Sequence, residues 1–424
     1  MSERKPKLRF KGFTDDWEQR KFHNVFDGLQ NNTLSRAELN YDGGEIQNVH
    51  YGDVLVKFGD YVDVSTEQLP YISNTALANK FSNSYLQNGD VVIADTAEDE
   101  TVGKCTEIVG AEGKKLISGL HTIPCRPKRA FASKFLGYYM NSNAYHAQLI
   151  PLMQGIKVTS ISKGVLQDTD MILPASFDEQ KQIGSYFSNL DNLITLHERK
   201  VKKLKNIKKS MLIKMFPANG QKKPEIRFAG YTDDWEQRKF SDIAEIRRGL
   251  TYKPTDISKE GVRVLRSSNI NEELFEVHED DVFVNANAVN IPYTKNGDIL
   301  ITSANGSNRL VGKHTVVRGI EVDSTVHGGF MLIASSDEPE FVNASMSSAW
   351  YTNFIKVFVA GGNGAIGNLN KKDLDEQDVL VPYREERDRI GSFFSNIDNL
   401  ITLHERKVKK LKKIKLSMLN NMFV

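Results

Sequence analysis

The chain has 424 residues, of which 40% are hydrophobic and 26% are charged. This composition is typical of a globular protein with two or three domains and excludes a disordered or low-complexity chain. No apolar stretch is long enough to cross a bilayer, and the first ten residues are too charged for a signal peptide. We therefore expect a cytoplasmic protein.

The net charge is +2, and it is unevenly distributed along the chain. Residues 178–216 and 384–424 carry an excess of Lys and Arg, whereas residues 1–177 and 217–383 are net negative. An overall negative field repels phosphate. Any contact of the two negative regions with nucleic acid would therefore depend on local basic and amide-bearing loops.

The start of the chain is repeated. Lys5–Phe22 reads KPKLRFKGFTDDWEQRKF, and Lys223–Phe240 reads KPEIRFAGYTDDWEQRKF, so 14 of 18 positions are identical. We expect Trp17 and Trp235 to anchor the first strand or helix of two equivalent domains. Internal repeats of this kind indicate one scaffold used twice.

A second segment is repeated more closely. Ile183–Phe216 and Ile390–Phe423 are identical at 28 of 34 positions, and neither run contains Pro or an internal Gly after its second residue. The residues between the repeated segments differ almost completely. This layout predicts two variable modules, each held in the same frame.

The second repeat has an apolar seam with alternating spacings of four and three residues, which predicts long paired helices. The seam positions are Leu190, Ile194, His197, Val201, Leu204, Ile397, Ile401, His404, Val408 and Leu411. We expect the two helices to pair in antiparallel orientation, with the histidines packed in the seam. The alternative is that each helix packs on its own domain. Whether pairing occurs within one chain or between chains is left open.

Each variable module contains an apolar run after Gly-Asp, namely GDVVIADTAEDETVGK from Gly89 and GDILITSANGSNRLVGK from Gly297. Both predict a short buried strand followed by a polar loop that ends in Gly-Lys. The second loop is rich in Asn and Arg, which can bind adenine and guanine through paired hydrogen bonds. The first loop is acidic, which favours a solvated turn, although carboxylates also accept from cytosine.

Motifs for cofactors and catalysis are weak. The pattern GxGxxG at Gly362, Gly364 and Gly367 lacks the strand and acidic residue of a dinucleotide site. Cys105 and Cys125 have no zinc-ligand spacing, and we expect no metal site.

A nuclease-like set can be assembled from Asp95, Glu112 and Lys114, but Ser303 stands in the second module where Asp95 stands in the first. We therefore expect no catalytic residues, and a stand-alone nuclease is an alternative hypothesis. A coiled-coil scaffold without a role in DNA binding is another.

Taken together, the repeated LRFxGFxDDW-like start, the entry Asp178–Glu179–Gln180 before Ile183, and the helix LDNLITLHERKVKKLK resemble the specificity subunit of type I restriction-modification enzymes. The second entry, Arg384–Glu385–Glu386, departs modestly from that pattern. The resemblance implies two target recognition domains, each reading one half of a bipartite double-stranded DNA sequence. The paired helices would set the spacer and dock two methyltransferase (modification) subunits. Restriction (motor-nuclease) subunits would cleave, and S-adenosylmethionine, ATP and magnesium would belong to these partners, with no cofactor in this chain.

The fold class expected is α+β, with two globular target recognition domains separated by a long antiparallel two-helix coiled coil. We expect target recognition domain 1 at 1–177, the central helix at 178–216, target recognition domain 2 at 217–383 and the C-terminal helix at 384–424. The residues expected to contact DNA lie in polar loops. They are Asn74, Thr75, Lys80, Thr96, Lys104 and Lys157 in the first module, and Arg266, Ser268, Asn269, Ser303, Asn305, Asn308, Arg309, Lys313 and Asn363 in the second.

Overall fold

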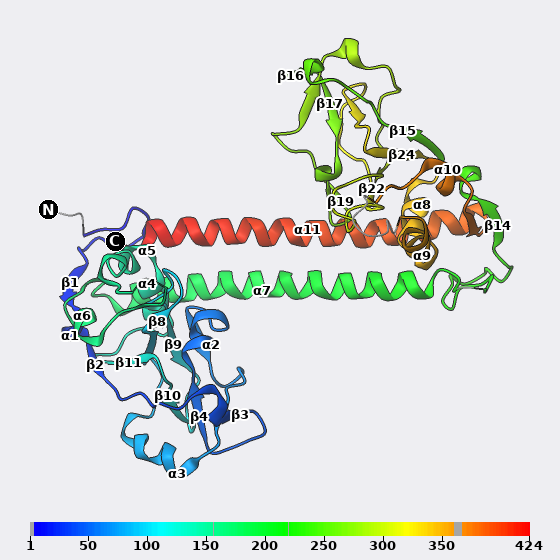
Figure 1. Ribbon diagram of the computed structural model, residues 1–424. Coiled ribbons are helices and arrows are strands. Elements are labelled where there is room, and N and C mark those ends of the chain that lie inside the picture. The colour runs from blue at the N-terminus through cyan, green and yellow to red at the C-terminus, as the bar shows by residue number, and fades with distance from the viewer. Residues whose placement is uncertain (1–3, 156, 219, 360–366) are drawn as a thin grey trace. The chain divides into compact units, whose positions relative to one another are not determined.

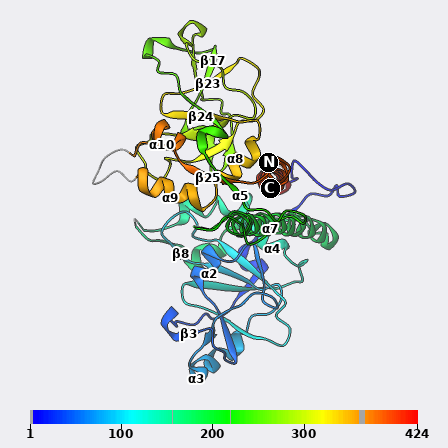
Figure 2. The ribbon, with the colours of Figure 1, turned by 90° about the vertical axis from the view of Figure 1, so that its right-hand side faces the viewer.

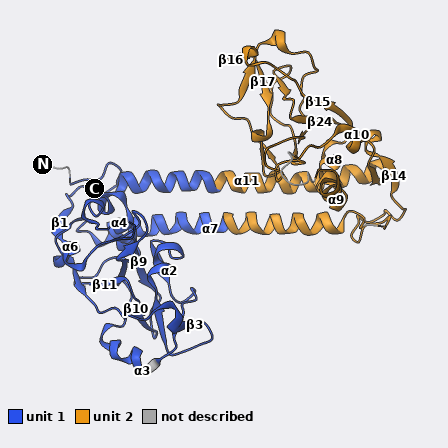
Figure 3. Cartoon of the chain, in the orientation of Figure 1, with its two compact units in different colours: residues 1–196, 408–424 blue, residues 197–407 orange. Residues whose placement is uncertain are grey.

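The computed structural model describes residues 4–155, 157–218, 220–359 and 367–424, apart from the side chain of Thr75 (Figure 1). The chain forms two compact units (Figure 3). Unit 1 contains residues 1–196 and 408–424, and unit 2 contains residues 197–407. There are two long helices, α7 (Phe177–Lys214) and α11 (Arg384–Met422). One part of each helix belongs to unit 1 and the other part belongs to unit 2. We call the globular part before α7 domain 1 and the part between α7 and α11 domain 2.

Domain 1 contains two main sheets. The first has the order β2 (Phe26–Gly28), β11 (Thr122–Pro127), β7 (Val91–Ala94), β9 (Cys105–Val109), β5 (Tyr61–Asp63). The second has the order β10 (Lys115–Ser118), β4 (Ile46–Val49), β6 (Tyr71–Ile72), β3 (Leu39–Asn40). The helix α4 (Phe135–Asn141) packs against β9 and is buried over most of its length. The helix α4 and the first sheet thus share one core cluster.

Domain 2 repeats this plan with two four-stranded sheets. One has the order β15 (Glu245–Arg248), β24 (Met331–Ser335), β21 (Ile299–Thr302), β22 (His314–Val316). The other has the order β16 (Ile257–Ser258), β20 (Val282–Val284), β17 (Val262–Leu265), β23 (Thr325–His327). The helices α8 (Pro339–Met346), α9 (Ala349–Phe358) and α10 (Lys371–Asp375) gather at the end of domain 2 opposite β17 and β23 (Figure 2). The expected α+β fold class is confirmed.

The two Gly-Asp motifs form the turns that begin β7 and β21. The carboxylate of Asp90 accepts a hydrogen bond from the backbone N–H of Gln87, and that of Asp298 accepts from Lys295, both at 2.8 Å. Both carboxylates are buried and paired with arginine. The predicted strands after these motifs are therefore present, each beginning at a capped turn.

The duplicated start forms the same anchor in each domain. In domain 1, β1 (Glu18–Lys21) pairs with β13 (Asp170–Leu173), the strand that precedes α7. In domain 2, β14 (Glu236–Lys239) pairs with β25 (Asp378–Val381), which precedes α11. Trp17 and Trp235 are buried beside these strands, as expected. The helix entries are fixed by buried carboxylates, because Arg9 binds Glu179 and Arg227 binds Glu386 at 2.6 and 2.7 Å.

In unit 1, the last turns of α11 pack against the first half of α7 and complete the core of domain 1. The ring of Phe423 lies 5.8 Å from Phe187 and 6.3 Å from Trp17. Further along, the ammonium of Lys415 binds Asp191 of α7 at 2.8 Å. Because residue numbers rise along one helix as they fall along the other, the pairing is antiparallel.

Unit 2 has the equivalent arrangement at the other halves of these helices. Phe216, at the end of α7, lies 5.8 Å from Trp235 and 6.0 Å from Phe394 of α11. The rings of His197 and His404 lie 4.9 Å apart. The end of each long helix thus completes the core of the domain in the other half of the sequence. The alternative in which each helix packs only on its own domain is wrong.

The heptad seam lies where the sequence predicts it. Leu190, Ile194, Ile397 and Ile401 are buried, with exposed fractions between 5% and 8%. The other seam residues, His197, Val201, Leu204, His404, Val408 and Leu411, are half-buried. Among the residues that the structure describes, no helix is long and apolar enough to cross a membrane.

Candidate nucleic-acid interface

Domain 2 has an open cleft of about 650 Å³ where its two main sheets meet. The walls are the segments that follow β15, β17 and β21 and the turn between β23 and β24, at residues 250–252, 266–267, 304–306 and 328–331. The backbone N–H of Leu250 donates to the carbonyl of His327 at 2.7 Å. A Cβ added at Gly249 would lie 2.0 Å from the carbonyl oxygen of Gly328, so this close approach requires glycine.

The side chains in this cleft combine donors with exposed aromatic surface. The Nε atom of Arg266 is buried and has no hydrogen-bond partner among the described residues. The amide of Asn305 donates to the hydroxyl of Ser267 at 3.0 Å. Phe330, also on the cleft wall, is 74% exposed. A buried donor without a partner costs free energy unless a ligand or water binds it, so the cleft suits a ligand with acceptors and a flat apolar face.

Domain 1 has a polar aromatic cluster at the ends of its own strands. The ring of Tyr51 lies 4.7 Å from His50 and 5.4 Å from His121. The hydroxyl of Thr96 donates to Asp95 at 2.7 Å, and the Nδ1 atom of His121 lies 3.4 Å from the same carboxylate.

Burial, assisted by the nearby charge of Arg36, lowers the pKa of His50. Its Nδ1 atom accepts a hydrogen bond from Gly52, so the neutral ring carries its proton on Nε2. The cluster therefore offers a carboxylate acceptor and imidazole donors in place of the guanidinium found in domain 2.

The polar cleft of domain 2 and the differently composed polar cluster of domain 1, both on a duplicated frame, agree with the result of comparison with protein families. Residues 14–206 and 232–413 match the family model described as the type I restriction modification DNA specificity domain. The chain belongs to this family. Both matched ranges contain one domain and part of the long helix that follows it.

Relatives of this specificity family cover most of the chain. The putative type I restriction enzyme MjaX specificity subunit of Methanocaldococcus jannaschii is 22% identical over 96% of this chain and 92% of the relative. The MjaVIII specificity subunit of the same organism is also 22% identical, over 63% of this chain, and this match spans 64% of that relative's length. The crystal structure of the type I S subunit from M. genitalium has a TM-score of 0.64 at 14% identity, over 99% of both chains. This likeness shows a shared fold.

The DNA-contacting residues expected in domain 1 lie in several different environments. Lys80 and Lys157 are exposed, and Thr96 belongs to the cluster around His121. Asn74 is exposed, and its side-chain oxygen caps the short helix α3 (Thr75–Ala78) by accepting from Leu77. The side chain of Thr75 lies outside the described part of the structure. A role in DNA contact stays a prediction for all of them.

Lys104 has an internal partner. It is half-buried, and its ammonium donates to the backbone carbonyl of Leu55 at 2.6 Å. Burial lowers its pKa. The preceding glycine of this Gly-Lys pair has a φ of +86°, and Gly312 of the second pair has a φ of +83°. The two Gly-Lys motifs therefore serve first as tight loop ends, for which glycine is suited.

In domain 2 the structure brings Arg266 and Asn305 together in the cleft. Ser268, Asn308 and Arg309 are exposed outside it, and Lys313 is half-buried. The side-chain oxygen of Asn308 accepts from the backbone of Gly367 at 3.0 Å. Asn363 lies outside the described residues. For these residues, too, DNA contact stays a prediction.

Two residues that the sequence predicts to contact DNA are buried, so their assignment to the DNA-binding surface is wrong. Asn269 is 0% exposed, and its amide donates to Asp281 and to the carbonyl of Glu276 while its oxygen accepts from Arg266. Ser303 is 6% exposed, and its backbone pairs with Phe330. In this conformation both residues hold the loop in place and present no side chain to a ligand.

The sequence did not single out Tyr252 and Phe330 of the domain 2 cleft, or His50, Tyr51 and His121 of the domain 1 cluster. For two of them a nearby glycine was a signal, because Phe330 directly follows Gly328–Gly329 and His121 stands two residues after Gly119. Such residues are common in cores, so the pattern acquires meaning only when the exposed fraction is known.

The three residues of the nuclease-like set contact different parts of domain 1. Asp95 binds Thr96, Glu112 accepts from Asn88, and the ammonium of Lys114 binds the carbonyl of Val64. Among the described residues, no group of three or more His, Cys, Asp or Glu could hold a metal ion. The structure therefore gives no support to this alternative.

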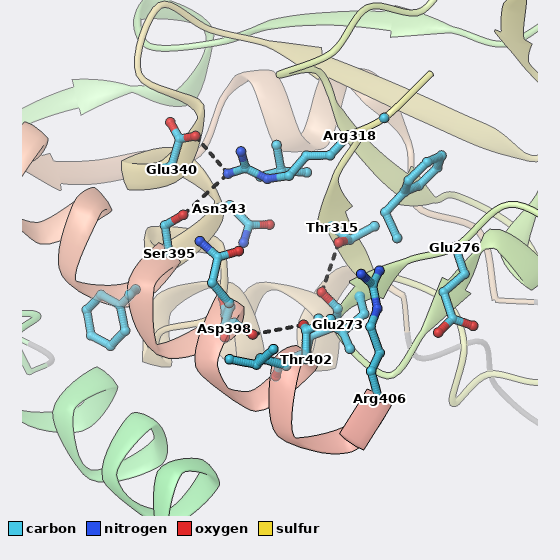
Figure 4. Close-up of a pocket in the computed structure, with 17 residues that line it drawn as sticks. Glu273, Glu276, Thr315, Arg318, Glu340, Asn343, Ser395, Asp398, Thr402 and Arg406 are labelled. Carbon is cyan, nitrogen blue, oxygen red and sulfur yellow. Dashed lines mark hydrogen bonds and ion pairs between the residues drawn. The ribbon is translucent and has the colours of Figure 1, made fainter. Parts of the chain in front are cut away.

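A second cavity, of about 590 Å³, lies in unit 2 between domain 2 and the face of α11 (Figure 4). The guanidinium of Arg318 spans it, binding Glu340 at 2.8 Å and Ser395 at 3.4 Å. The hydroxyl of Thr315 donates to the carbonyl of Glu273, whose carboxylate binds Lys208. The polar groups here are largely paired with each other, and the cavity is part of the junction between α11 and domain 2.

Proposed function

We propose that the protein is the DNA-reading subunit of a type I restriction-modification complex, in which each domain reads one half of a two-part target. The observation that carries this proposal is the pair of dissimilar polar sites, a cleft in domain 2 and a cluster in domain 1, in one duplicated frame. Identical frames place both domains on the helices in the same way, while different cleft residues select different bases. A bipartite and asymmetric target follows.

The two long helices serve as the spacer. They are continuous over 38 and 39 residues, and a helix rises about 1.5 Å per residue. Because their halves are paired in both units, bending of either helix is opposed by its partner. The length of the pair would therefore determine how many unread base pairs separate the two halves of the target, as dimer geometry determines half-site spacing in other DNA-binding proteins.

The helices also offer the same apolar surface twice. Leu193 and Leu196 on α7 are 45% and 47% exposed, and their repeat equivalents on α11, Leu400 and Leu403, are 45% and 46% exposed. Exposed leucines grouped on a helix are typical of a partner-binding site. Two copies of one surface would accept two copies of one partner, and we propose that these are the methyltransferase subunits.

The chemistry would belong to the partner subunits. S-adenosylmethionine would bind to the methyltransferase subunits, and ATP and magnesium to the restriction subunits, with this chain contributing sequence recognition and no catalytic residue. The complex would act in the cytoplasm, where its DNA substrate is.

Selection from a randomised duplex pool tests this function. The full chain, alone and with its methyltransferase subunit, is incubated with the pool, and bound duplexes are sequenced. We expect two short defined tracts separated by a fixed undefined gap. Enrichment of a single tract, or of none, would contradict the proposal, and cleavage by the chain alone with magnesium would favour the nuclease hypothesis.

A further inference from the structure

The backbone places the domain 1 cluster and the domain 2 cleft at equivalent positions, although their sequences differ. Three hydrogen bonds recur one for one. They are Asn32 N–H to Ser118 O, Gly119 N–H to Val49 O and Asp95 N–H to His121 O in domain 1, and Leu250 N–H to His327 O, Gly328 N–H to Leu265 O and Ser303 N–H to Phe330 O in domain 2. The parallel strand pairs β4–β10 and β17–β23 share the same register at these points. The residues of the two sites can therefore be compared position by position.

This correspondence pairs residues that the sequence alone does not align. His50 follows Val49 as Arg266 follows Leu265, so His50 and Arg266 are equivalent. By the same bonds, His121 is equivalent to Phe330. The backbone frame is shared, whereas the side chains change from two imidazoles, of which His50 is 7% exposed and His121 is exposed, to a guanidinium and a phenyl ring.

Resting on the proposed function, we propose that the accessible side chains at these positions, His121 in domain 1 and Arg266 and Phe330 in domain 2, are specificity-determining contacts to the DNA bases. Frame positions that keep their backbone bonds while exchanging side chains are suited to changing the base that is read. The loops predicted from the sequence would then contribute contacts around this central site.

The chemistry of the domain 2 cleft favours guanine. Arginine donates to the O6 and N7 acceptors of guanine in the major groove, the commonest specific contact of this side chain. Arg266 and Asn305 both line the cleft, the Nε atom of Arg266 has no partner among the described residues, and the amide of Asn305 supplies a further donor. The exposed ring of Phe330 provides an apolar face for a neighbouring base or a thymine methyl group.

The chemistry of the domain 1 cluster favours a base that presents an amino group. The carboxylate of Asp95, held by Thr96 beside His121, accepts hydrogen bonds and repels the electronegative edge of guanine. The two clefts would thus prefer different bases because opposite charges line them.

Single replacements in the full chain test this inference by the same duplex selection. Arg266→Ala and Phe330→Ala should each change base preference within one tract only, and His121→Ala within the other. Arg266→Ala should also weaken binding to the selected duplex by about 10- to 100-fold at fixed salt, as loss of one paired base contact does. Binding to unrelated DNA should change little, because phosphate contacts carry it.

Val322→Ala is the matched control, because Val322 is an exposed apolar residue of domain 2 that does not line the cleft. Phe330 is mostly exposed, so its replacement leaves the core intact, and thermal unfolding of each variant checks this. If the unmodified chain selects two tracts and all three variants select the same ones, this inference is wrong and the proposed function stands. If the unmodified chain selects no tracts, the proposed function itself fails.

Discussion

The duplicated frame, which consists of the repeated start of each domain and the two long helices, differs from the two polar sites in what it repeats. In the frame, repeat-equivalent residues make the same contacts in both units, as the pairs Arg9–Glu179 and Arg227–Glu386 show. In the clefts, equivalent backbone positions carry different side chains, such as His121 and Phe330. The difference teaches that one set of residues determines where a domain sits on the helices and a separate set determines what the domain contacts. Each set can be tested by changing it alone.

The largest effect should follow from lengthening the frame without touching either cleft. A duplicate of Glu198–Leu204 inserted after His197, with a duplicate of Glu405–Leu411 after His404, adds one heptad to both helices where they face each other. Seven residues add about 10 Å, or about three base pairs at 3.4 Å each.

Duplex selection should return both tracts unchanged with a gap longer by about three base pairs. A seven-residue insertion in α7 alone puts the pair out of register and serves as the control. An unchanged gap in the double insertion would show that the helices do not set the spacing.

The next largest effect should come from the aromatic residues that end each helix. Phe423→Ala removes a ring that packs on Trp17, Phe135, Tyr139 and Phe187, and Phe216→Ala removes the equivalent ring in unit 2. Each loss should cost about 3–5 kcal/mol of unfolding free energy.

Hydrogen exchange of the full chain should locate the loss in domain 1 for Phe423→Ala and in domain 2 for Phe216→Ala. Loss of protection in the same domain for both variants would contradict the exchange of helix ends between the two halves of the sequence.

A third test uses a buried acid that only one domain has. Glu107 is 1% exposed, and burial raises its pKa to about 7, although the backbone N–H groups of Gly137 and Lys134 donate to it. The equivalent position in domain 2 is Val316, since β9 and β22 pair with β7 and β21 in the same register.

Because the folded state raises this pKa, the folded state holds the proton more tightly than the unfolded chain. The stabilisation is complete below about pH 4.5 and is lost as the pH rises through about 7. The free energy of unfolding that is lost has an upper limit of about 3 kcal/mol. Protection of domain 1 against hydrogen exchange, corrected for intrinsic rates, should fall over this range more than that of domain 2. In Glu107→Gln the difference between the domains should shrink, and a Glu107→Gln chain with the unmodified pH profile would contradict this assignment.

The smallest of these effects should distinguish two equivalent lysines of the frame. Lys415 binds Asp60 and Asp191, whose side chains are 16% and 29% exposed, whereas Lys208 binds Asp398 and the half-exposed Glu273. The surrounding carboxylates outweigh the effect of burial and raise the pKa of both lysines.

Lys415→Met leaves two poorly hydrated carboxylates and should cost about 3 kcal/mol, near the lower end for a broken buried pair. Lys208→Met should cost about 2 kcal/mol, because Glu273 can rehydrate. Urea unfolding, followed separately in each domain by hydrogen exchange, measures both losses. The reverse order of the two losses would show that exposure of the acid does not control the cost.

The sequence predicted the frame well because periodic and duplicated patterns report local structure. The heptad spacing alone placed Leu190 and Ile397 in a helix seam, and the Gly-Asp pairs predicted β7 and β21. The clefts were predicted poorly because their walls come from four segments far apart in the chain. Asn269 and Arg266 stand three residues apart in one polar loop, yet Asn269 is buried by Asp281 and only Arg266 faces the cleft. Lys415 could not be matched to Asp60 from spacing, since a tertiary contact joins them.

The position of Phe423 inside the core of domain 1 also affects how the protein is made. Domain 1 contains residues from the beginning of the chain, but α11, which completes its core, is synthesised only after all of domain 2. During translation the nascent domain 1 therefore exposes an apolar socket for the time it takes to make the second half, a state in which chains are prone to aggregate. A premature stop codon anywhere in α11 would accordingly destabilise domain 1, although that domain is encoded at the other end of the reading frame.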